Sequence, residues 1–177
     1  MDGQRPDARR LAVWRDFLQG HSLLMVQLER ELKDGAGLSL AEYDVLLRLR
    51  EAPGRRMRMS DLSVAVLYTT GGLTRLVDRM AQASLVTREP APGDRRGVYA
   101  VLTDTGVERL AEAAAVHLAG VQRNFAALLP DRELDQVAGF LARLAPGGAP
   151  EEFDACGATA VAAAVEAGSH GGRSTRR

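Results

Sequence analysis

Residues 85–103 read LVTREPAPGDRRGVYAVLT, and this stretch decides the fold. Two short runs rich in Val, Tyr and Thr, at 85–89 and 97–102, flank a turn that contains Pro90, Pro92, Gly93 and Asp94. Proline and glycine interrupt regular structure, whereas β-branched and aromatic residues favour strands. The stretch therefore predicts a β-hairpin whose turn is tipped by Arg95 and Arg96.

The residues before this hairpin predict a short helix with one polar face. Between Thr70 and Met80, apolar residues recur at helical spacing, at Leu73, Leu76, Val77 and Met80. The opposite face carries Thr74, Arg75, Asp78 and Arg79. A basic hairpin directly after such a helix is typical of the wing of a winged helix-turn-helix, which binds DNA. Gly71 and Gly72 are poor helix formers, so they either permit a close approach of DNA or form a loose turn.

The charge of the chain is unevenly distributed, although its net value is zero. Residues 55–99 hold eight arginines against four acidic residues, whereas residues 103–146 hold four arginines against six acidic residues. Affinity for DNA depends on where the cations lie, because Lys and Arg near phosphates release condensed counterions. The middle of the chain is therefore the expected DNA-binding segment, with a solvated charged face as the alternative.

Helical periodicity also covers both ends of the chain. The apolar spacing predicts long helices from Leu11 to Leu32 and from Thr103 to Leu128, the second ended by Pro130. A last helix is expected to turn four apolar residues inward, namely Leu134, Val137, Leu141 and Leu144. These helices expose more apolar surface than a small central module can cover. A symmetric homodimer buries it most economically, and a monomer with the helices folded back is the alternative.

Shorter elements lie between the long helices. Ser39 and Glu42 have the spacing of a capping box, for a second helix that extends to about Arg50. Residues 55–59 alternate polar and apolar side chains, which predicts one short strand. The arginines of this strand either contact phosphates or lie in a solvated loop. Ser60 is expected to cap a third helix that ends near Val66.

The composition excludes several classes of protein. With 46% hydrophobic residues, the chain can bury a core made mainly of Leu, Val and Ala. A single cysteine, Cys156, excludes an internal disulfide and a Cys-rich zinc site, and we expect no metal and no cofactor. The chain shows no phosphate-binding loop, nucleophile elbow or dinucleotide turn, so we expect no enzyme. The sequence has neither a run of about 18 apolar residues nor the apolar block of a signal peptide, and the expected location is the cytoplasm.

Over roughly residues 10–146, the chain resembles the MarR family of transcriptional regulators. The resemblance rests on four motifs in order, namely LSLAEYDVL at 38–46, MSDL at 59–62, GLTRLVDRM at 72–80, and DRR at 94–96 followed by LTDTG at 102–106. It implies a mainly α fold with a small β-hairpin wing, with long N- and C-terminal dimerisation helices. The implied division is a dimerisation helix at 1–37, a DNA-binding lobe at 38–102, further dimerisation helices at 103–146 and a disordered tail at 147–177.

The resemblance also implies a function and the residues that carry it. A homodimer of this family would bind a pseudo-palindromic operator in double-stranded DNA, as a repressor released by a small-molecule effector. The expected DNA-binding residues are Thr69, Thr70, Gly71, Thr74, Arg75, Arg79, Asp94, Arg95 and Arg96. Among these, Arg96 would enter the minor groove, where an arginine meets enhanced negative potential, and Asp94 would orient it. The alternative is a winged-helix module that binds another protein.

Four further residues carry expectations. Trp14 and His21 on the first helix could line a pocket for an aromatic or phenolic effector, between the dimer helices and the DNA-binding lobe, and His117 is a further candidate contact. For each of these, ordinary packing in a dimer interface is the alternative. Ser84 stands where the family usually has a glycine in a left-handed conformation, so either Ser84 is strained or the turn differs there.

Overall fold

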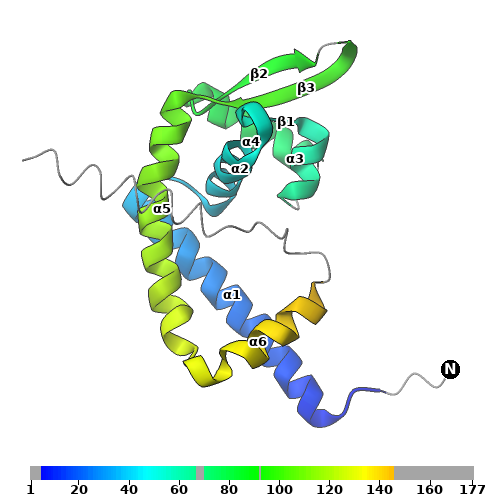
Figure 1. Cartoon of the computed structure of the whole chain (residues 1–177), viewed down its shortest axis with the longest axis vertical. Helices are drawn as coiled ribbons and strands as arrows, with labels where there is room; N and C mark the ends of the chain where they lie inside the picture. The colour runs from blue at the N-terminus through cyan, green and yellow to red at the C-terminus, as the bar shows by residue number, and fades with distance from the viewer. Residues whose placement is uncertain (1–4, 67–69, 92, 146–177) are drawn as a thin grey trace, which may run out of the picture.

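The computed structural model describes residues 5–66, 70–91 and 93–145. Within them the elements are α1 (Ala8–Ala36), α2 (Leu40–Glu51), η1 (Pro53–Arg55), β1 (Arg56–Arg58), α3 (Met59–Ala65), α4 (Thr70–Gln82), β2 (Val86–Ala91), β3 (Asp94–Leu102), α5 (Asp104–Asn124), η2 (Ala126–Leu128) and α6 (Asp131–Leu144). Figure 1 shows α2–α4 and the strands gathered at one end, with α1 and α5 extending away and α6 near the far end. The mainly helical winged helix-turn-helix expected from the sequence is confirmed. The expected tail at 147–177 and Cys156 lie outside the described residues.

The strands form one antiparallel sheet in the order β1-β3-β2. The hairpin is confirmed, but its strands are longer than predicted, because β2 continues to Ala91 and β3 begins at Asp94. Arg95 and Arg96 therefore belong to β3 rather than to the turn. Pro90 is tolerated because β2 lies at an edge and its register shifts between Pro90 and Ala91.

The helix caps follow the sequence with one exception. Ser39 and Glu42 form the predicted capping box, in which the Glu42 amide donates to Ser39 Oγ (3.2 Å) and the Ser39 amide donates to Glu42 Oε2 (2.8 Å). The prediction that Ser60 caps α3 is wrong. The strand β1 leads directly into α3, so the change from extended to helical backbone falls at Arg58, and α3 already begins at Met59.

One apolar core joins the lobe to the upper parts of α1 and α5. The inner face of α4 is buried as the spacing predicts, with Leu73, Val77 and Met80 fully inaccessible. The core continues through fully buried or nearly buried side chains of the neighbouring elements, including Leu32, Leu46, Leu49, Leu62, Val86, Ala100 and Leu110. This packing holds α4 in place, so that its polar face is turned away from the core.

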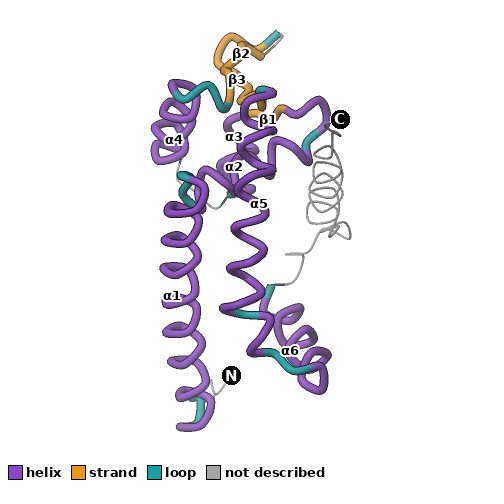
Figure 2. The backbone as a smooth tube through the Cα atoms, turned by 90° about the vertical axis from the view of Figure 1, so that its left-hand side faces the viewer, coloured by secondary structure: helices purple, strands orange, loops and turns teal. Residues whose placement is uncertain are grey.

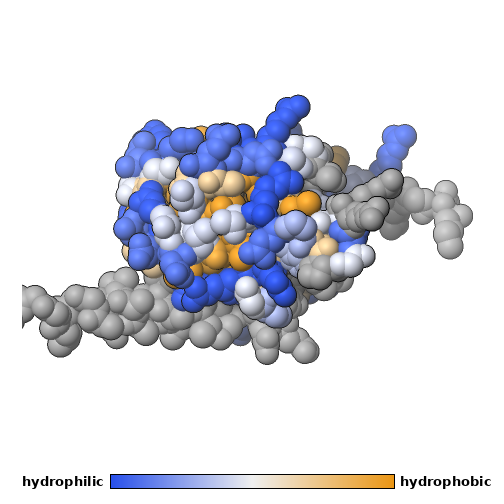
Figure 3. All heavy atoms as spheres, turned by 90° about the horizontal axis from the view of Figure 1, so that it is seen from above, coloured by the Kyte–Doolittle hydropathy of each residue, from blue (hydrophilic) through white to orange (hydrophobic). Residues whose placement is uncertain are grey.

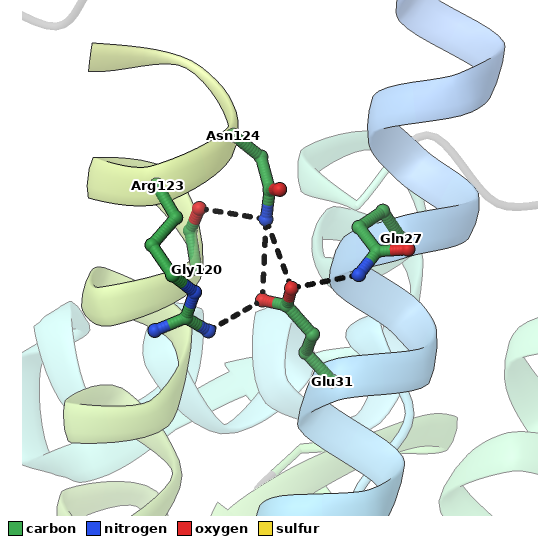
Figure 4. A network of polar contacts seen from close by, with 5 residues as sticks. All are labelled: Gln27, Glu31, Gly120, Arg123 and Asn124. Carbon is green, nitrogen blue, oxygen red and sulfur yellow. Dashed lines mark hydrogen bonds and ion pairs between the residues drawn. The ribbon is translucent and has the colours of Figure 1, made fainter. Parts of the chain in front are cut away.

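A polar network fastens α1 to α5, which run side by side in Figure 2. The Glu31 carboxylate accepts hydrogen bonds from Gln27 (2.8 Å), Arg123 (2.9 Å) and Asn124 (3.1 Å), as Figure 4 shows. Asn124 also donates to the Gly120 carbonyl at 2.9 Å. A Cβ at Gly120 would lie 2.6 Å from Glu31 Oε2, so the absence of a side chain there permits the close approach of the two helices.

Helices α1 and α6 carry large apolar side chains that this chain leaves exposed. Trp14 is 51% exposed and Leu23 63%, and on α6 Leu134 and Leu144 are each 50% exposed. The expected inward orientation of the α6 residues is therefore not met within one chain, because α6 has no buried residue. Among the described residues, no helix is long and apolar enough to cross a membrane.

Candidate nucleic-acid interface

The outer face of α4 combines small, polar and cationic side chains. Arg75 is exposed, and it forms no ion pair with another described residue. Gly71, one turn earlier, is also exposed, and a Cβ built there would meet nothing within 4 Å. Thr74 lies on the same face. This face offers hydrogen-bond donors, a cation and an unobstructed backbone, which are the groups that a helix presents to base edges and phosphates.

The wing is attached to the rest of the lobe by ion pairs. Arg88 on β2 pairs with Asp78 on α4, which links the hairpin to the helix beside it. Arg58 Nη1 on β1 lies 3.1 Å from Asp94 Oδ2 at the start of β3. Seen from above, the end of the molecule that holds the wing is rimmed by hydrophilic side chains, with apolar ones nearer its centre (Figure 3).

Not every arginine in the basic segment is available to a ligand. Arg55 pairs with Asp104 at 3.3 Å, so together with Arg58 and Arg88 it already has a carboxylate partner. Arg56 lies over the Tyr99 ring, with its guanidinium carbon 5.2 Å from the ring centroid. In the described part of the chain, Arg56, Arg75 and Arg79 have no carboxylate partner. The local positive charge is thus concentrated on fewer side chains than the sequence suggests.

The predicted DNA-binding residues fall into three groups. Gly71, Thr74 and Arg75 share the outer face of α4, and the backbone of Thr70 begins that helix. Arg79 lies toward the side of α4 that also carries Gly72 and Leu76, where these residues line a pocket. Asp94, Arg95 and Arg96 lie at the outer end of β3, and Thr69 lies outside the described residues.

Trp14 and His21, the expected effector contacts, both lie on α1. Trp14 lines a pocket of about 580 Å³ with Phe17 of α1 and with Phe140 and Leu144 of α6. The residues that line this pocket belong to the first turns of α1, the segment just before it and α6, so within one chain the pocket does not extend to the DNA-binding lobe. That Trp14 contacts an effector stays a prediction. Helix α1 is so long that its first turns are far from the lobe. His21 is exposed, with its ring centroid 6.4 Å from that of Phe17.

A different pocket, of about 740 Å³, lies where α1, α2, α4 and α5 meet. Its lining includes Tyr43 and His117, whose ring centroids are 4.6 Å apart, and Leu76 and Arg79 of α4. Burial raises the pKa of Tyr43 and lowers the pKa of His117. His117 Nδ1 is buried and has no hydrogen-bond partner among the described residues. Sequence reasoning named His117 but could not pair it with Tyr43, because only the tertiary fold brings the two rings together.

Comparisons with known proteins agree with this geometry. Residues 36–97 match the model of the MarR family. The chain is 37% identical to AbsC, a MarR family transcriptional regulator from Streptomyces coelicolor, over 81% of this chain and 97% of that one, with a TM-score of 0.74. Sco3205, a MarR family regulator of the same organism crystallised in complex with DNA, is 31% identical over 85% of this chain and 95% of that one, with a TM-score of 0.75. YkoM, an uncharacterized HTH-type transcriptional regulator of Bacillus subtilis, is 29% identical over 73% of this chain and 81% of that protein.

Proposed function

This chain belongs to the MarR family of DNA-binding transcriptional regulators, and we propose that it is a homodimeric repressor that a small-molecule effector releases from a pseudo-palindromic operator. The observation that carries the proposal is the outer face of α4, where Arg75 has no ion-pair partner among the described residues. The inner face of the same helix is locked into the core. Such a helix can lie in the major groove without unfolding any of the lobe.

Operator binding would combine α4 with the wing. Thr74 and Arg75 would reach base edges, while the backbone amide groups at the start of α4, near Thr70 and Gly71, would bind a phosphate. Arg95 and Arg96 would bring the wing into the adjacent minor groove, where an arginine is favoured by the negative potential. As a regulator of this kind, the protein would act in the cytoplasm.

The homodimer is supported by the apolar side chains that one chain leaves exposed on α1 and α6. A second copy would cover them, and two-fold symmetry would place two α4 helices side by side on one face. Two half-sites about one helical turn apart, roughly 34 Å, would then match the operator.

Release by an effector is supported by the pocket that contains Tyr43 and His117. The pocket touches α1 and α5, which would form the dimer, and it also touches α4 through Leu76 and Arg79. Two of its carboxylates, Glu29 and Glu42, already accept hydrogen bonds from the start of α2, whereas Lys33 and Arg79 have no ion-pair partner among the described residues. An aromatic or phenolic anion would suit this combination. The two α4 helices of a dimer can bind the operator only at a separation that matches its half-sites. An effector that binds better to a dimer with another separation lowers the affinity for DNA.

Fluorescence anisotropy tests the function directly. The probes are the duplex upstream of the protein's own gene and a scrambled duplex of equal length, at about 150 mM salt, where affinities are comparable with those in cells. A preference of about 10³ or more for the first duplex is expected of a specific regulator. Equal, weak binding to both duplexes would contradict specific recognition of that site, and no binding to either would favour a module that contacts another protein.

A further inference from the structure

We propose that Arg58 is a positioning residue for DNA binding, which holds the outer half of the wing through Asp94 and does not itself contact the phosphates. The proposal rests on the proposed function of the wing. The sequence alone leaves the arginines at 55–58 divided between phosphate contacts and a solvated loop, whereas the structure assigns Arg58 a third role.

The sheet leaves the outer part of the hairpin with only two strands. The short strand β1 pairs with β3 from Arg56 opposite Val101 to Arg58 opposite Tyr99, and it ends there. The part of β3 nearer the tip, from Asp94 to Val98, therefore pairs with β2 alone. A two-stranded hairpin is marginally stable in water. Its partner strand is weakened further, because the register shifts at Pro90 and Ala91 and proline has no amide hydrogen to donate.

The Arg58 side chain extends the hold of β1 beyond the end of that strand. Its Nη1 lies 3.1 Å from Asp94 Oδ2, and its guanidinium carbon lies 5.7 Å from the centroid of the Tyr99 ring. One side chain thus touches the middle of β3 at Tyr99 and the start of β3 at Asp94. No other ion pair among the described residues joins β1 to β3.

The pair also solves an electrostatic problem of the wing. Asp94 lies beside Arg95 and Arg96, where a bare carboxylate would repel DNA phosphates. Arg58 compensates that charge from within the protein. Because the side chains of Arg58 and Asp94 are only 42% and 43% exposed, the pair is partly shielded from solvent. Arg56 differs, since it lies over the same ring without a carboxylate partner among the described residues.

The test is a salt series of operator binding for the wild type, Arg58→Ala, Asp94→Ala and the double variant, with Arg55→Ala as the matched control. Arg55 is also a half-exposed arginine in an ion pair, but its partner is Asp104, outside the wing. We expect Arg58→Ala to weaken binding by about fivefold, in line with a partly exposed pair. The slope of log K against log salt should stay unchanged. The double variant should bind DNA no more weakly than the single variant with the lower affinity. The control should bind like the wild type.

A phosphate contact predicts a different result. Loss of one such contact makes the slope shallower by about 0.9 and shows no coupling to position 94. That result, or wild-type binding by Arg58→Ala, overturns the proposal. If Arg58→Ala does not fold, Asp94→Asn tests the same pair: weaker binding with an unchanged slope supports the proposal, and wild-type binding overturns it.

A second measurement does not depend on DNA. Amide hydrogen exchange in the free protein should be faster at 94–98 in Arg58→Ala than in the wild type, with exchange in α4 unchanged. Unchanged exchange at 94–98 contradicts the bracing role even if the protein binds DNA. A third outcome combines faster exchange at 94–98 in Arg58→Ala with a wild type that shows no specific DNA binding. This outcome would refute the proposed function, while the structural link between Arg58 and the wing would stand.

Discussion

At the scale of single residues, Ser84 departs from the family pattern, which has a glycine here, and its backbone is strained. Its φ is 59°, in the left-handed region that a side chain disfavours. The turn is held there by neighbours, because the Ser84 carbonyl accepts a hydrogen bond from Thr103 Oγ1 at 2.7 Å. Thr103 also caps α5, so this one hydroxyl ties the start of α5 to the end of the α4 turn. The chain therefore tolerates the strain at Ser84.

We expect Ser84→Gly to raise the free energy of unfolding by about 1 kcal/mol. Glycine removes the energetic penalty of the left-handed conformation, and part of this gain is offset because glycine loses more backbone entropy on folding. Urea denaturation followed by circular dichroism measures the change. Ser84→Ala is the matched control, since alanine keeps the Cβ and hence the strain. Equal stability of the glycine and alanine variants would show that the turn costs nothing at this position.

The residue scale also marks what sequence alone could not reach. The capping box at Ser39 was predictable because it depends on a few consecutive residues, and the left-handed position at Ser84 was predictable from the family resemblance. The partners of the arginines were not, since Arg58 and Asp94 are far apart in the sequence and meet only once the sheet has formed. The sequence therefore shows where the basic residues lie, while their division into paired and available arginines required the fold.

At the scale of elements, the spacing of apolar residues predicted each long helix, whereas ends set by neighbouring elements were missed. The inner face of α4 was predicted because the core repeats every three or four residues. The strands β2 and β3 were predicted too short, since Pro90 and Asp94 favour turns locally, although Pro90 is tolerated on the edge strand β2 and Asp94 begins β3. Likewise, Ser60 is a good cap by type, and β1 moves the start of α3 ahead of it.

The contact between α1 and α5 gives a prediction for pH. The pKa of Glu31 lies below its ordinary value, chiefly because Gln27 and Asn124 donate hydrogen bonds to the carboxylate and further because of Arg123. A lowered pKa in the folded state means that Glu31 contributes stability above its unfolded pKa, and the contribution is lost as pH falls through the folded value. We therefore expect Glu31→Gln to be less stable than the wild type at pH 7, with the difference shrinking below about pH 4.

Urea titrations of both proteins at several pH values from about 7 down to about 3 test this expectation. Glu108→Gln on α5 is a suitable control, because Glu108 is an exposed acid with no ion pair to another described residue. A stability difference between Glu31→Gln and the wild type that stays constant across the whole range would mean that the network depends on shape and not on the charge of Glu31.

At the scale of the whole molecule, the apolar surface that one chain leaves uncovered is evident from local patterns, whereas the pocket is not. The spacing of apolar residues on both terminal helices is enough to indicate a surface that one chain leaves uncovered. The pocket of Tyr43 and His117 is formed by four helices, so no local pattern marks it, whereas the pocket that Trp14 lines is formed by α1 and α6. Aromatic character alone does not tell which end of a long helix meets a lobe.

The exposed face of α6 yields the last prediction, for Leu141→Asp. Leu141 is 40% exposed and belongs to the stripe with Leu134 and Leu144. In a dimer that covers this stripe, the variant loses about 2 kcal/mol of apolar burial and also buries a charge, so the dimer Kd should rise by at least about tenfold. The wild type should have twice the chain mass of 19.0 kDa by light scattering, and the variant should shift toward the mass of one chain on dilution.

The matched control is Gln136→Asp, which adds the same charge on the opposite side of α6. It should remain dimeric. Operator affinity should fall in Leu141→Asp and not in the control, because a monomer reaches one half-site only and loses the second set of contacts. A Leu141→Asp protein that stays fully dimeric would exclude this face from the dimer. A wild type that is monomeric at every concentration would contradict the proposed homodimer. The proposal of a two-fold operator would then lose its structural basis.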